Sequence, residues 1–373
     1  MSRIVFAPDS FKGTLDAPAV AQALARGWRL HDPFAEIVLR PMADGGEGTV
    51  ACFALAEPAA RRMPVEVRGP DGLPRTAEWL LLPATDRDPG GVGVVELANT
   101  SGIELLGRQR LPEDADTTGF GQAIAAALDH GVSRLVLGIG SSASTDGGLG
   151  MLRALGATFT DATGSPVTSG ARGLAAVAAA DLTVLRPLPA DGASVITDVT
   201  NPLLGPTGAA AVFGPQKGMD ADGVQRADEG LRHFSDLLGG DPGEPGSGAA
   251  GGTGYALRLW GARLAPGAKA IAGLIRLRQA VADADLVVTG EGQFDSQSLA
   301  GKVPSAVAAI ARSAGVAAAV VAGQIALDAD SSDFAHAISL TDIAGGLEQS
   351  MAEPAHWLCR AGALLSEAAS LPT

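Results

Sequence analysis

The sequence predicts an α/β fold of two domains, one built around a parallel, Rossmann- or flavodoxin-like sheet and the other a mixed α/β domain inserted into it. The chain has 373 residues, which exceeds one ordinary domain. Apolar runs alternate with helix-like stretches in three separate regions, as is typical of parallel sheets. The 50 glycines and the low aromatic content of 4% suit helices that pack closely on a sheet.

The parallel domain is assembled from separated segments. The first runs from "RIVFAPDS" through "APAVAQALARGWRL" to "AEIVLRPMADGG", and the second joins "GQAIAAALDHG" to "SRLVLGIGSSASTDGG". The third contains "DLVVTGEG", "VPSAVAAIARSAG" and "VAAAVVAG". We therefore assign residues 1–61, 115–157 and 275–373 to this domain.

The inserted domain has a different pattern. The stretches "VEVRGPDGLPRTAEWLLLP" and "GVGVVELANTSG" read as short, turn-linked strands of a more antiparallel kind. A later irregular region includes "GGDPGEPGSGAAGGTG", whose composition predicts a flexible loop. Residues 62–114 and 158–274 are assigned to this domain.

Charge and composition exclude several classes of protein. The net charge of −14 argues against a nucleic-acid partner or an anionic membrane surface, because both are bound by clustered Lys and Arg. Two cysteines cannot make a disulfide framework, and neither CxxC nor HExxH is present for zinc. The chain has no signal-peptide pattern and no apolar stretch long enough to span a bilayer, so we expect a cytoplasmic protein.

Carboxylates recur where predicted strands end beside glycine or a hydroxyl. They are Asp9, Asp44, Asp146, Asp198 and the pair Glu291 and Asp295. A single Asp-Gly most often marks a turn, but the carboxyl ends of strands in an open α/β sheet line the ligand crevice. Acids that converge there need a cation, and Mg²⁺ with one or two carboxylates and phosphate oxygens is the natural occupant.

Lysine is rare in this chain and lies beside glycine. Only four of the 27 basic residues are lysine, and three of these touch a glycine: Lys12, Lys217 and Lys302. Either this is a compositional accident or these sites need a compact ammonium rather than a planar guanidinium. On the second interpretation, the three lysines hold phosphate or a substrate carboxylate.

Two familiar nucleotide-binding motifs have partial matches in the sequence. "SQSLAGKVP" is not a P-loop, because Ser296 stands where the first glycine belongs and Val303 where the metal-binding hydroxyl belongs. Gly138, Gly140 and Ala143 do match the dinucleotide fingerprint, with Asp161 near the distance of a ribose-binding acid. An NAD-dependent dehydrogenase of a small hydroxy acid is therefore an alternative, although Asp-Gly-Gly is a poor helix start for a pyrophosphate.

Phosphoryl transfer fits the inventory of residues best. It needs cations on the phosphates, close backbone approach and a base for the acceptor hydroxyl, rather than a covalent nucleophile. No G-x-S-x-G elbow is present, and the five histidines lie outside the glycine-rich motifs. A non-catalytic nucleotide-binding regulator is the remaining alternative.

Several motifs resemble the bacterial glycerate kinases of the two-domain type. They are "APDSFKGTL", "MADGGEGT", "GIGSSASTDGGLGMLRALGA", "TDVTNPLLGPTGAAAVFGPQKG", "GSGAAGGTG" and "TGEGQFDSQSLAGKVP". The resemblance covers nearly the whole chain. It implies ATP-dependent phosphorylation of D-glycerate, with 2-phosphoglycerate as the expected product, Mg²⁺ as cofactor and an active site in the cleft between two α/β domains. Departures from the family pattern include Ser141, Ser144 and Thr145, and Gln293 where many relatives have arginine.

The candidate site residues follow from these motifs. The catalytic candidates are Asp44, Asp198, Lys12 and Lys302, and the metal candidates are Asp198, Glu291 and Asp295. The substrate- and ATP-binding candidates are small or hydrogen-bonding residues, together with one lysine: Ser10, Gly45, Gly46, Gly140, Ser142, Gly147, Gly148, Asn201, Lys217, Gly290, Gly292 and Ser298. The sequence leaves open which acid is the base, the stereochemical preference, the position phosphorylated and the oligomeric state, a homodimer included.

Overall fold

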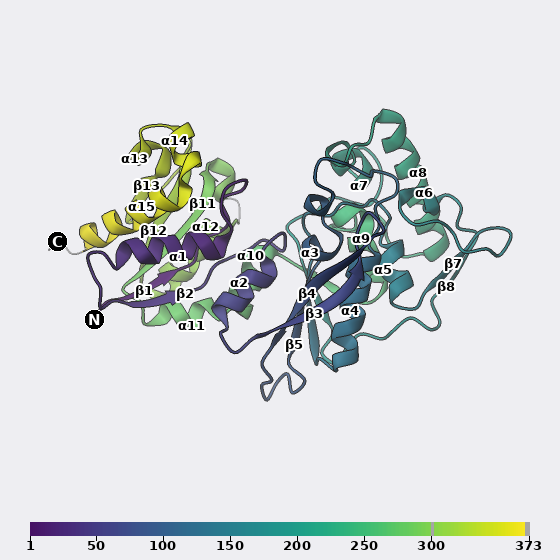
Figure 1. The fold of residues 1–373 in the computed structure, drawn as a ribbon, viewed down its shortest axis with the longest axis horizontal. Helices are drawn as coiled ribbons and strands as arrows, with labels where there is room; N and C mark the ends of the chain where they lie inside the picture. Colours follow the sequence, from purple (N-terminus) through teal and green to yellow (C-terminus); the bar gives the residue numbers. More distant parts are fainter. Residues whose placement is uncertain (300–301, 370–373) are drawn as a thin grey trace. The chain divides into compact units, whose positions relative to one another are not determined.

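In the computed structural model, which describes residues 1–299 and 302–369, the chain divides into two compact units. The first unit contains Met1–Asp44, Ala51–Pro58 and Gly267–Thr373, and the second contains Gly45–Val50 and Ala59–Pro266. Each unit is built on its own sheet (Figure 1).

The first unit holds a five-stranded parallel sheet within the described residues, in the order β13-β12-β11-β1-β2. Its strands are β1 (Arg3–Phe6), β2 (Glu36–Leu39), β11 (Leu286–Phe294), β12 (Ala317–Ile325) and β13 (His336–Ser339). Numbered along this unit, the order is 2-1-3-4-5, which is the flavodoxin-like order. The predicted parallel sheet and its assembly from both ends of the chain are confirmed, and Figure 1 shows purple β1 beside green β11.

Helices pack on both sides of this sheet. They are α1 (Ala17–Trp28), α10 (Gly267–Leu274), α11 (Leu277–Ala282), α12 (Val303–Ala314), α13 (Leu340–Ala344), α14 (Leu347–Ala352) and α15 (Pro354–Ala369), with the short 3₁₀ turn η4 (Ser296–Leu299). Helix α1 begins where the Asp16 carboxylate accepts a hydrogen bond from Ala19 N. It packs closely on α15, because a Cβ at Gly27 would lie 1.8 Å from Cys359 O. Helix α2 (Thr49–Ala56) begins in residues of the second unit and continues in the first.

The second unit holds a mixed six-stranded sheet in the order β10-β9-β6-β5-β4-β3, again within the described residues. Its strands, with those of the separate β7–β8 pair, are β3 (Arg61–Arg68), β4 (Pro74–Leu82), β5 (Val92–Glu96), β6 (Arg134–Gly138), β7 (Thr158–Thr160), β8 (Ala179–Asp181), β9 (Ala193–Ile196) and β10 (Arg263–Ala265). Strands β3 and β4 form an antiparallel hairpin and β4 pairs antiparallel with β5, as the turn-rich sequence predicts. The other pairs of this sheet are parallel.

One predicted domain assignment is corrected by these pairings. We expect residues 115–157 in the parallel domain, but β6 pairs with β5 and β9, so the segment belongs to the second unit. The helix–strand pattern of this segment predicts parallel pairing, and its strand β6 does pair in parallel with both neighbours. The second sheet also has a parallel half, however, and periodicity cannot say which sheet a strand joins.

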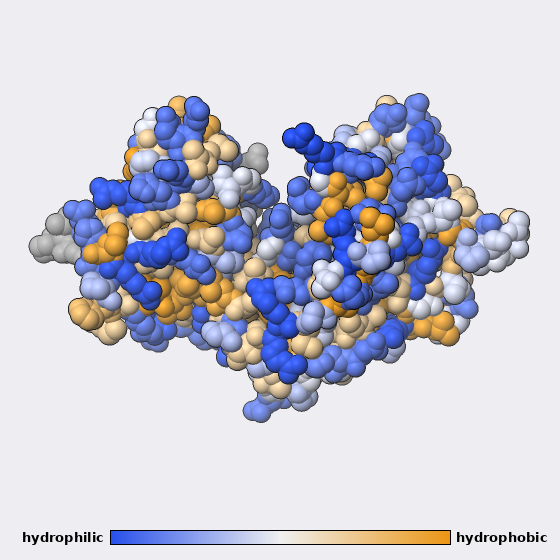
Figure 2. Space-filling model, viewed as in Figure 1, coloured by the Kyte–Doolittle hydropathy of each residue, from blue (hydrophilic) through white to orange (hydrophobic). Residues whose placement is uncertain are grey.

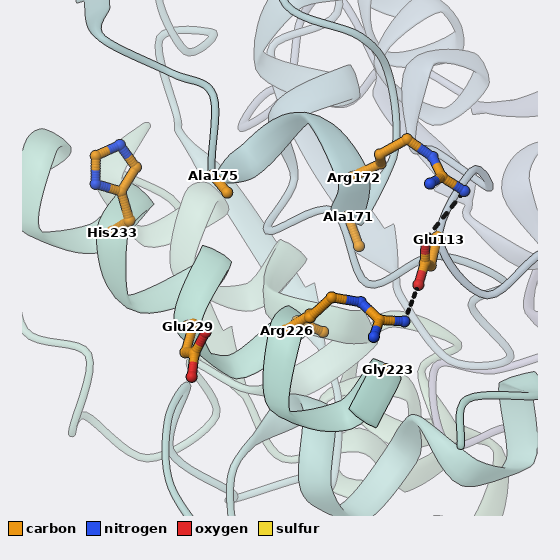
Figure 3. Close-up of a pocket in the computed structure, with 9 residues that line it drawn as sticks. Glu113, Ala171, Arg172, Ala175, Gly223, Arg226, Glu229 and His233 are labelled. Carbon is orange, nitrogen blue, oxygen red and sulfur yellow. Dashed lines mark hydrogen bonds and ion pairs between the residues drawn. The ribbon is translucent and has the colours of Figure 1, made fainter. Parts of the chain in front are cut away.

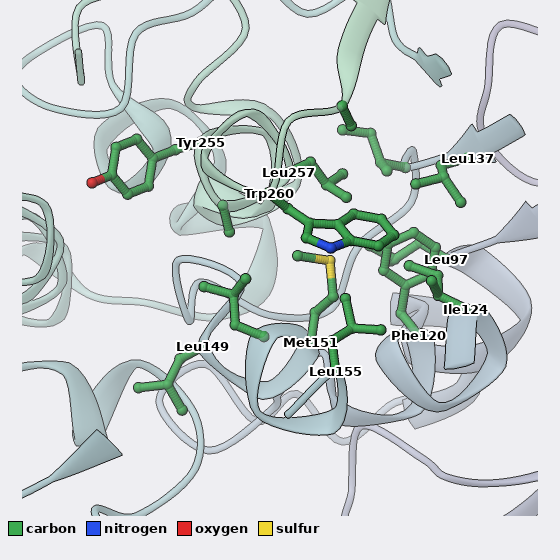
Figure 4. Packing of buried hydrophobic residues seen from close by; sticks show 14 of the residues in the cluster. Leu97, Phe120, Ile124, Leu137, Leu149, Met151, Leu155, Tyr255, Leu257 and Trp260 are labelled. Atoms are coloured by element: carbon green, nitrogen blue, oxygen red, sulfur yellow. The ribbon is translucent and has the colours of Figure 1, made fainter. Parts of the chain in front are cut away.

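The core of the second unit lies between its large sheet and its helices. These are α3 (Ala98–Ser101), α4 (Thr118–His130), α5 (Leu149–Ala154), α6 (Ala171–Leu174), α7 (Ala209–Phe213), α8 (Ala221–Leu238) and α9 (Thr253–Leu259). Figure 4 shows part of this core, with Met151, Leu155 and Trp260 among its side chains. The Trp260 indole satisfies its one donor by bonding Arg186 O at 2.6 Å.

The surface mixes hydrophilic and hydrophobic residues on the face drawn in Figure 2. Among the residues that the structure describes, no helix combines the length and the apolar character needed to cross a membrane.

Candidate active site

The first unit brings strand-end acids together at the switch point of its sheet. Strand β1 lies between β2 and β11, so the strand order reverses beside the carboxyl ends of β1 and β11. Asp9 follows β1, and its backbone N–H continues the pairing by donating to Gly290 O at 2.7 Å. Glu291 lies in β11 and Asp295 directly follows it. This is the place where a doubly wound sheet binds its ligand.

Asp9, Asp44 and Glu291 interact electrostatically. Burial raises the pKa of Asp9 from 3.8 to about 7, and the Asp44 carboxylate and then Glu291 add to the rise. Lys12 and the bond from Ser10 N, at 2.6 Å, oppose it. Asp44 and Glu291 thus both act on Asp9, and the predicted meeting of these two acids with each other stays a prediction. Asp9 is a strand-end acid in the sequence, but it is absent from the predicted site residues.

Glu291 carries a buried oxygen without a partner. Its residue is 8% exposed, and its Oε1 has no hydrogen-bond partner in the described part of the chain. Burial raises the pKa of this carboxyl, while Ser298 and then Lys302 lower it. A buried, unsatisfied carboxylate oxygen costs free energy unless a cation or a donor completes it.

Asp295 and Ser298 form a local turn at the end of β11. Ser298 N and its hydroxyl bond Asp295 Oδ1 at 3.1 and 3.2 Å, and Asp295 N bonds the hydroxyl at 3.0 Å. The turn fixes the chain just where η4 begins. Ser298 therefore positions Asp295, and its predicted contact with a ligand stays a prediction.

Lys12 and Lys302, two of the three lysines of this unit, are exposed. Lys12 and Lys302 both act on Glu291 with opposite charge, although they lie far apart in the sequence. Lys302 is the residue that precedes helix α12. Its predicted motif "AGKVP" also contains Ala300 and Gly301, which lie outside the described residues.

Gly290 has a structural reason to lack a side chain, whereas Gly292 does not. A Cβ at Gly290 would lie 2.2 Å from Val321 O of the neighbouring strand. At Gly292 it would lie 3.5 Å from Lys12 N, which is ordinary contact. Close approach of a ligand at these positions stays a prediction.

The donor set suits a hard divalent cation. No group of three or more His, Cys, Asp or Glu in residues 1–299 and 302–369 is arranged to hold a metal by itself. Mg²⁺, however, needs only one or two carboxylates when phosphate oxygens and water supply the rest. The unpartnered Glu291 Oε1, with Asp9 and Asp44 beside it, fits that requirement.

In the second unit the predicted glycines pack strand ends closely. Gly140 N donates to Gly45 O at 2.9 Å, and a Cβ on Gly140 would lie 2.5 Å from the Cα of Gly46. A Cβ at Gly45 would lie 2.2 Å from Ile196 O. These glycines join the 45–46 turn to the carboxyl ends of β6 and β9.

The loop of residues 140–148, which we call the serine loop, is held tightly. Its end packs against helices of the unit, since a Cβ at Gly147 would meet Phe234 at 3.1 Å and one at Gly148 would meet Ala256 at 2.5 Å. Ser142 is buried, and its hydroxyl accepts a bond from Ser144 N at 3.2 Å. The space at these glycines is thus filled by protein, and their predicted contact with phosphate stays a prediction.

Asp146 organises the serine loop. It is 0% exposed and accepts bonds from Thr117 N, Thr117 Oγ1 and Gly150 N at 2.9, 2.8 and 3.1 Å. Burial, followed by the neighbouring Asp116, raises its pKa. With its acceptors engaged by the protein, Asp146 has a structural role in place of the metal role suggested by its strand-end position.

Lys217 lies inside the unit. It is 2% exposed, and its Nζ donates to Ser144 O. A contact with phosphate would require this bond to be replaced, so the predicted role of Lys217 as a ligand contact is less well supported than those of Lys12 and Lys302.

Asp198 and Asn201 follow β9 in the second unit. Asp198 is exposed. The Asn201 side-chain amide donates to Thr207 O at 2.8 Å and closes the loop between them. The predicted meeting of Asp198 with Asp44 and Glu291 stays a prediction, because those two belong to the first unit.

Glu96 is a buried acid that the sequence reasoning did not single out. It ends β5, is 4% exposed and accepts bonds from Gly48 N and Val50 N at 3.2 and 2.8 Å. These amides belong to the orphan donors at the start of α2. Burial raises the pKa of Glu96 from 4.5 to about 7. A lone acid at the end of the apolar run "GVGVVE" is the signal that could have found it.

The dinucleotide fingerprint lacks its structural context. After β6 the next helix, α5, begins only at Leu149 and has six residues. Asp161 lies half-buried in its own turn, where its Oδ1 accepts bonds from Thr163 and Ser165. The fingerprint requires the third small residue to open a helix, so this geometry disfavours a bound dinucleotide.

A cavity of about 310 Å³ lies between α6 and α8, away from every predicted site residue. Figure 3 shows Arg172 and Arg226 directed toward Glu113, which pairs with them at 3.0 and 2.6 Å. At the other end, His233 Nε2 lies 2.6 Å from Val177 O. Since both guanidinium groups already pair with Glu113, this cavity is not the candidate active site.

Comparison with known proteins gives consistent matches. The model of the glycerate kinase family matches residues 4–369. A glycerate kinase from Halalkalibacterium halodurans is 40% identical over 333 residues, covering 87% of this chain and 86% of that protein. A glycerate 2-kinase from Escherichia coli K12 is 40% identical over 318 residues, covering 83% and 82%. A crystal structure from Salmonella typhimurium LT2, provisionally assigned as glycerate kinase 2, matches with a TM-score of 0.83 and 36% identity over 99% of this chain and 98% of that one.

Proposed function

The chain belongs to the glycerate kinase family, and from that premise we propose that it transfers the γ-phosphoryl group of ATP to D-glycerate, giving 2-phosphoglycerate and ADP with Mg²⁺ as cofactor. The resemblance found in the sequence motifs is thereby confirmed, and the protein is a kinase. The dehydrogenase and regulator alternatives are not favoured.

One observation supports the proposed site, namely that Asp9, at the switch point of the parallel sheet, interacts electrostatically with both Asp44 and Glu291. Kinases without a covalent intermediate depend on positioning and on charge stabilisation around the transferred group. Acids, lysines and a closely packed backbone at one sheet edge provide both.

We assign the roles in the first unit as follows. When bound, Mg²⁺ would neutralise phosphate oxygens, and Glu291 with Asp44 would hold it. Lys12 and Lys302 donate to phosphate oxygens or to the substrate carboxylate. Asp9, which interacts electrostatically with Asp44 and Glu291, accepts the proton of the attacking hydroxyl.

In the phosphoryl transfer one P–O bond forms while another breaks. The hydroxyl oxygen of glycerate bonds the γ-phosphorus as the bond from that phosphorus to the β,γ-bridging oxygen breaks, and ADP leaves with that oxygen. The hydroxyl proton passes to the Asp9 carboxylate and then to solvent. The predicted role of Asp198 as a further metal ligand is retained as part of the proposal. We also place the reaction in the cytoplasm, where ATP is available.

The test is a product assay on the full chain. Purified protein with D-glycerate, ATP and MgCl₂ should yield ADP and a phosphoglycerate whose phosphorus resonance identifies the 2-phosphate, and EDTA should abolish turnover. Formation of the 3-phosphate would correct the position of attack, whereas NAD-dependent oxidation of a hydroxy acid without ADP formation would overturn the proposal.

A further inference from the structure

Lys217 ends the short 3₁₀ turn η2 (Pro215–Lys217) and reaches the serine loop from inside the unit. Its Nζ donates to Ser144 O, and its side chain is buried with Asp146 as the neighbouring counter-charge. Burial lowers the pKa of this ammonium from 10.5 to about 8. Burying a lysine in this way costs free energy, so we infer that Lys217 has a role that an apolar residue could not fill.

The loop that it holds is in an unfavourable conformation. Ser141 has a φ of 59°, in a region that side chains other than glycine rarely adopt. Ala250, in the neighbouring 3₁₀ turn η3 (Ala249–Gly252), has a φ of 52°, and its carbonyl lies 3.5 Å from Ser142 Oγ. Thr145 Oγ1 is buried without a hydrogen-bond partner among the described residues. Such features persist only where the surroundings impose them, and they cluster at functional sites.

Two anchors impose this conformation. Lys217 fixes the carbonyl of Ser144, and the Asp146 carboxylate fixes the loop two residues later through Thr117 and Gly150. Thr145, whose buried hydroxyl has no hydrogen-bond partner among the described residues, lies between these anchors. Asp146 is held by neutral donors, whereas the bond of Lys217 to Ser144 comes from a long, flexible side chain that must itself be buried.

We propose that Lys217 is a positioning residue that holds the serine loop in the conformation needed for catalysis and does not itself contact phosphate or glycerate. The proposal rests on the kinase function proposed above only for its effect on rate. Its structural part, that Lys217 holds the loop, rests on the hydrogen bond from Lys217 Nζ to Ser144 O and on the burial of the Lys217 side chain.

The decisive measurement uses the ligand-free protein. In Lys217→Met, which keeps an unbranched side chain only one atom shorter and removes its donor, amide hydrogen exchange across 141–148 should become about tenfold faster or more, while β5 and β6 keep their protection. Lys12→Met is the matched control, because Lys12 is exposed and belongs to the other unit. It should leave the exchange of the serine loop unchanged.

Kinetics provide the second readout. Lys217→Met should lower kcat on the order of 10²-fold, as expected from misplaced reacting groups, with KM for ATP and for glycerate within about threefold of the parent. Lys217→Gln, which retains a shorter donor, should recover part of both the rate and the protection. Lys269→Met, at an exposed lysine of α10, should change neither.

The outcomes separate the two proposals. Unchanged loop exchange in Lys217→Met together with a KM raised about tenfold or more would show direct ligand contact and overturn the positioning role. Unchanged exchange and unchanged kinetics would also overturn it. If the parental protein has no glycerate kinase activity, the proposed function fails, yet the exchange experiment still decides whether Lys217 holds the loop. If Lys217→Met does not fold, the exchange of Lys217→Gln decides it.

Discussion

Asp9 is the residue whose environment says most about the proposed chemistry. It combines burial, a neighbouring Asp44 and a backbone fixed to β11. Burial next to another carboxylate disfavours the charged form of an acid, and acids in such environments are typical of functional sites.

We predict that Asp9→Asn lowers kcat by 10² to 10⁴, on the order expected for loss of a general base, without unfolding the protein. The amide keeps the size of the side chain, and the bond of Asp9 N to Gly290 O does not involve it. Steady-state kinetics and thermal melts measure both effects. Asp161→Asn, in an exposed turn, is the control and should keep parental activity. A near-parental kcat in Asp9→Asn would assign the proton to another group.

The lysines permit a second test at the scale of single residues. We predict that Lys12→Arg and Lys302→Arg each lose most of kcat, on the order of 10²-fold, while folding normally. The guanidinium is broader than the ammonium and cannot make the same point contact. Lys269→Arg should be tolerated. Parental rates in all three variants would mean that the rarity of lysine is compositional and that backbone amides and the metal hold the phosphates.

At the scale of elements, the start of α2 depends on a carboxylate whose ionisation opposes folding. Glu96 accepts from Gly48 N and Val50 N, and burial raises its pKa from 4.5 to about 7. Between these two pH values the folded state binds the proton more tightly than the unfolded state. The contribution of Glu96 to stability is therefore largest below pH 4.5 and falls as the pH rises to about 7.

We predict that the free energy of unfolding falls more steeply with pH in the parent than in Glu96→Gln, by up to about 3 kcal/mol between pH 5 and 8. Gln can still accept a bond, but it does not ionise. Urea unfolding at several pH values measures the difference. Glu104→Gln, at an exposed position, should follow the parent. Parallel curves for the parent and Glu96→Gln would show that Glu96 ionises equally in both states.

Elements also show what could be predicted from the sequence. The parallel strands and the β3–β4 hairpin can be predicted from the sequence, because local periodicity and turn residues determine them. Membership of β6 in the second sheet depends on pairing with strands distant in the chain, which local periodicity does not encode. The same limit applies to the site. Strand-end placement found the acids, but burial of Lys217 and the engagement of Asp146 by Thr117 depend on packing.

At the scale of the whole molecule, the second unit is an insertion into the first. Residues 1–44 and 267–373 belong to one unit, and most of the chain between them belongs to the other. Strand β1 pairs with β11 through contacts such as Ile4 with Leu286. Its other neighbour, β2, is local in sequence.

We predict that a chain ending at residue 275 keeps residues 59–266 resistant to limited proteolysis while residues 1–44 and 51–58 are cleaved, because β11, β12 and β13 are missing. Mass spectrometry of the fragments identifies the protected part, and the full chain, protected in both units, is the control. Cleavage throughout residues 59–266 would mean that the second unit needs the first to fold.

This insertion also sets an order of events during synthesis. Strand β1 emerges from the ribosome first, yet its partner β11 is made some 280 residues later, about 15 to 60 seconds at ordinary elongation rates. During that interval the second unit can complete its sheet, while the edge of β1 that later pairs with β11 has no partner strand. The unpaired edge of β1 is thus open to mispairing with other strands during that interval.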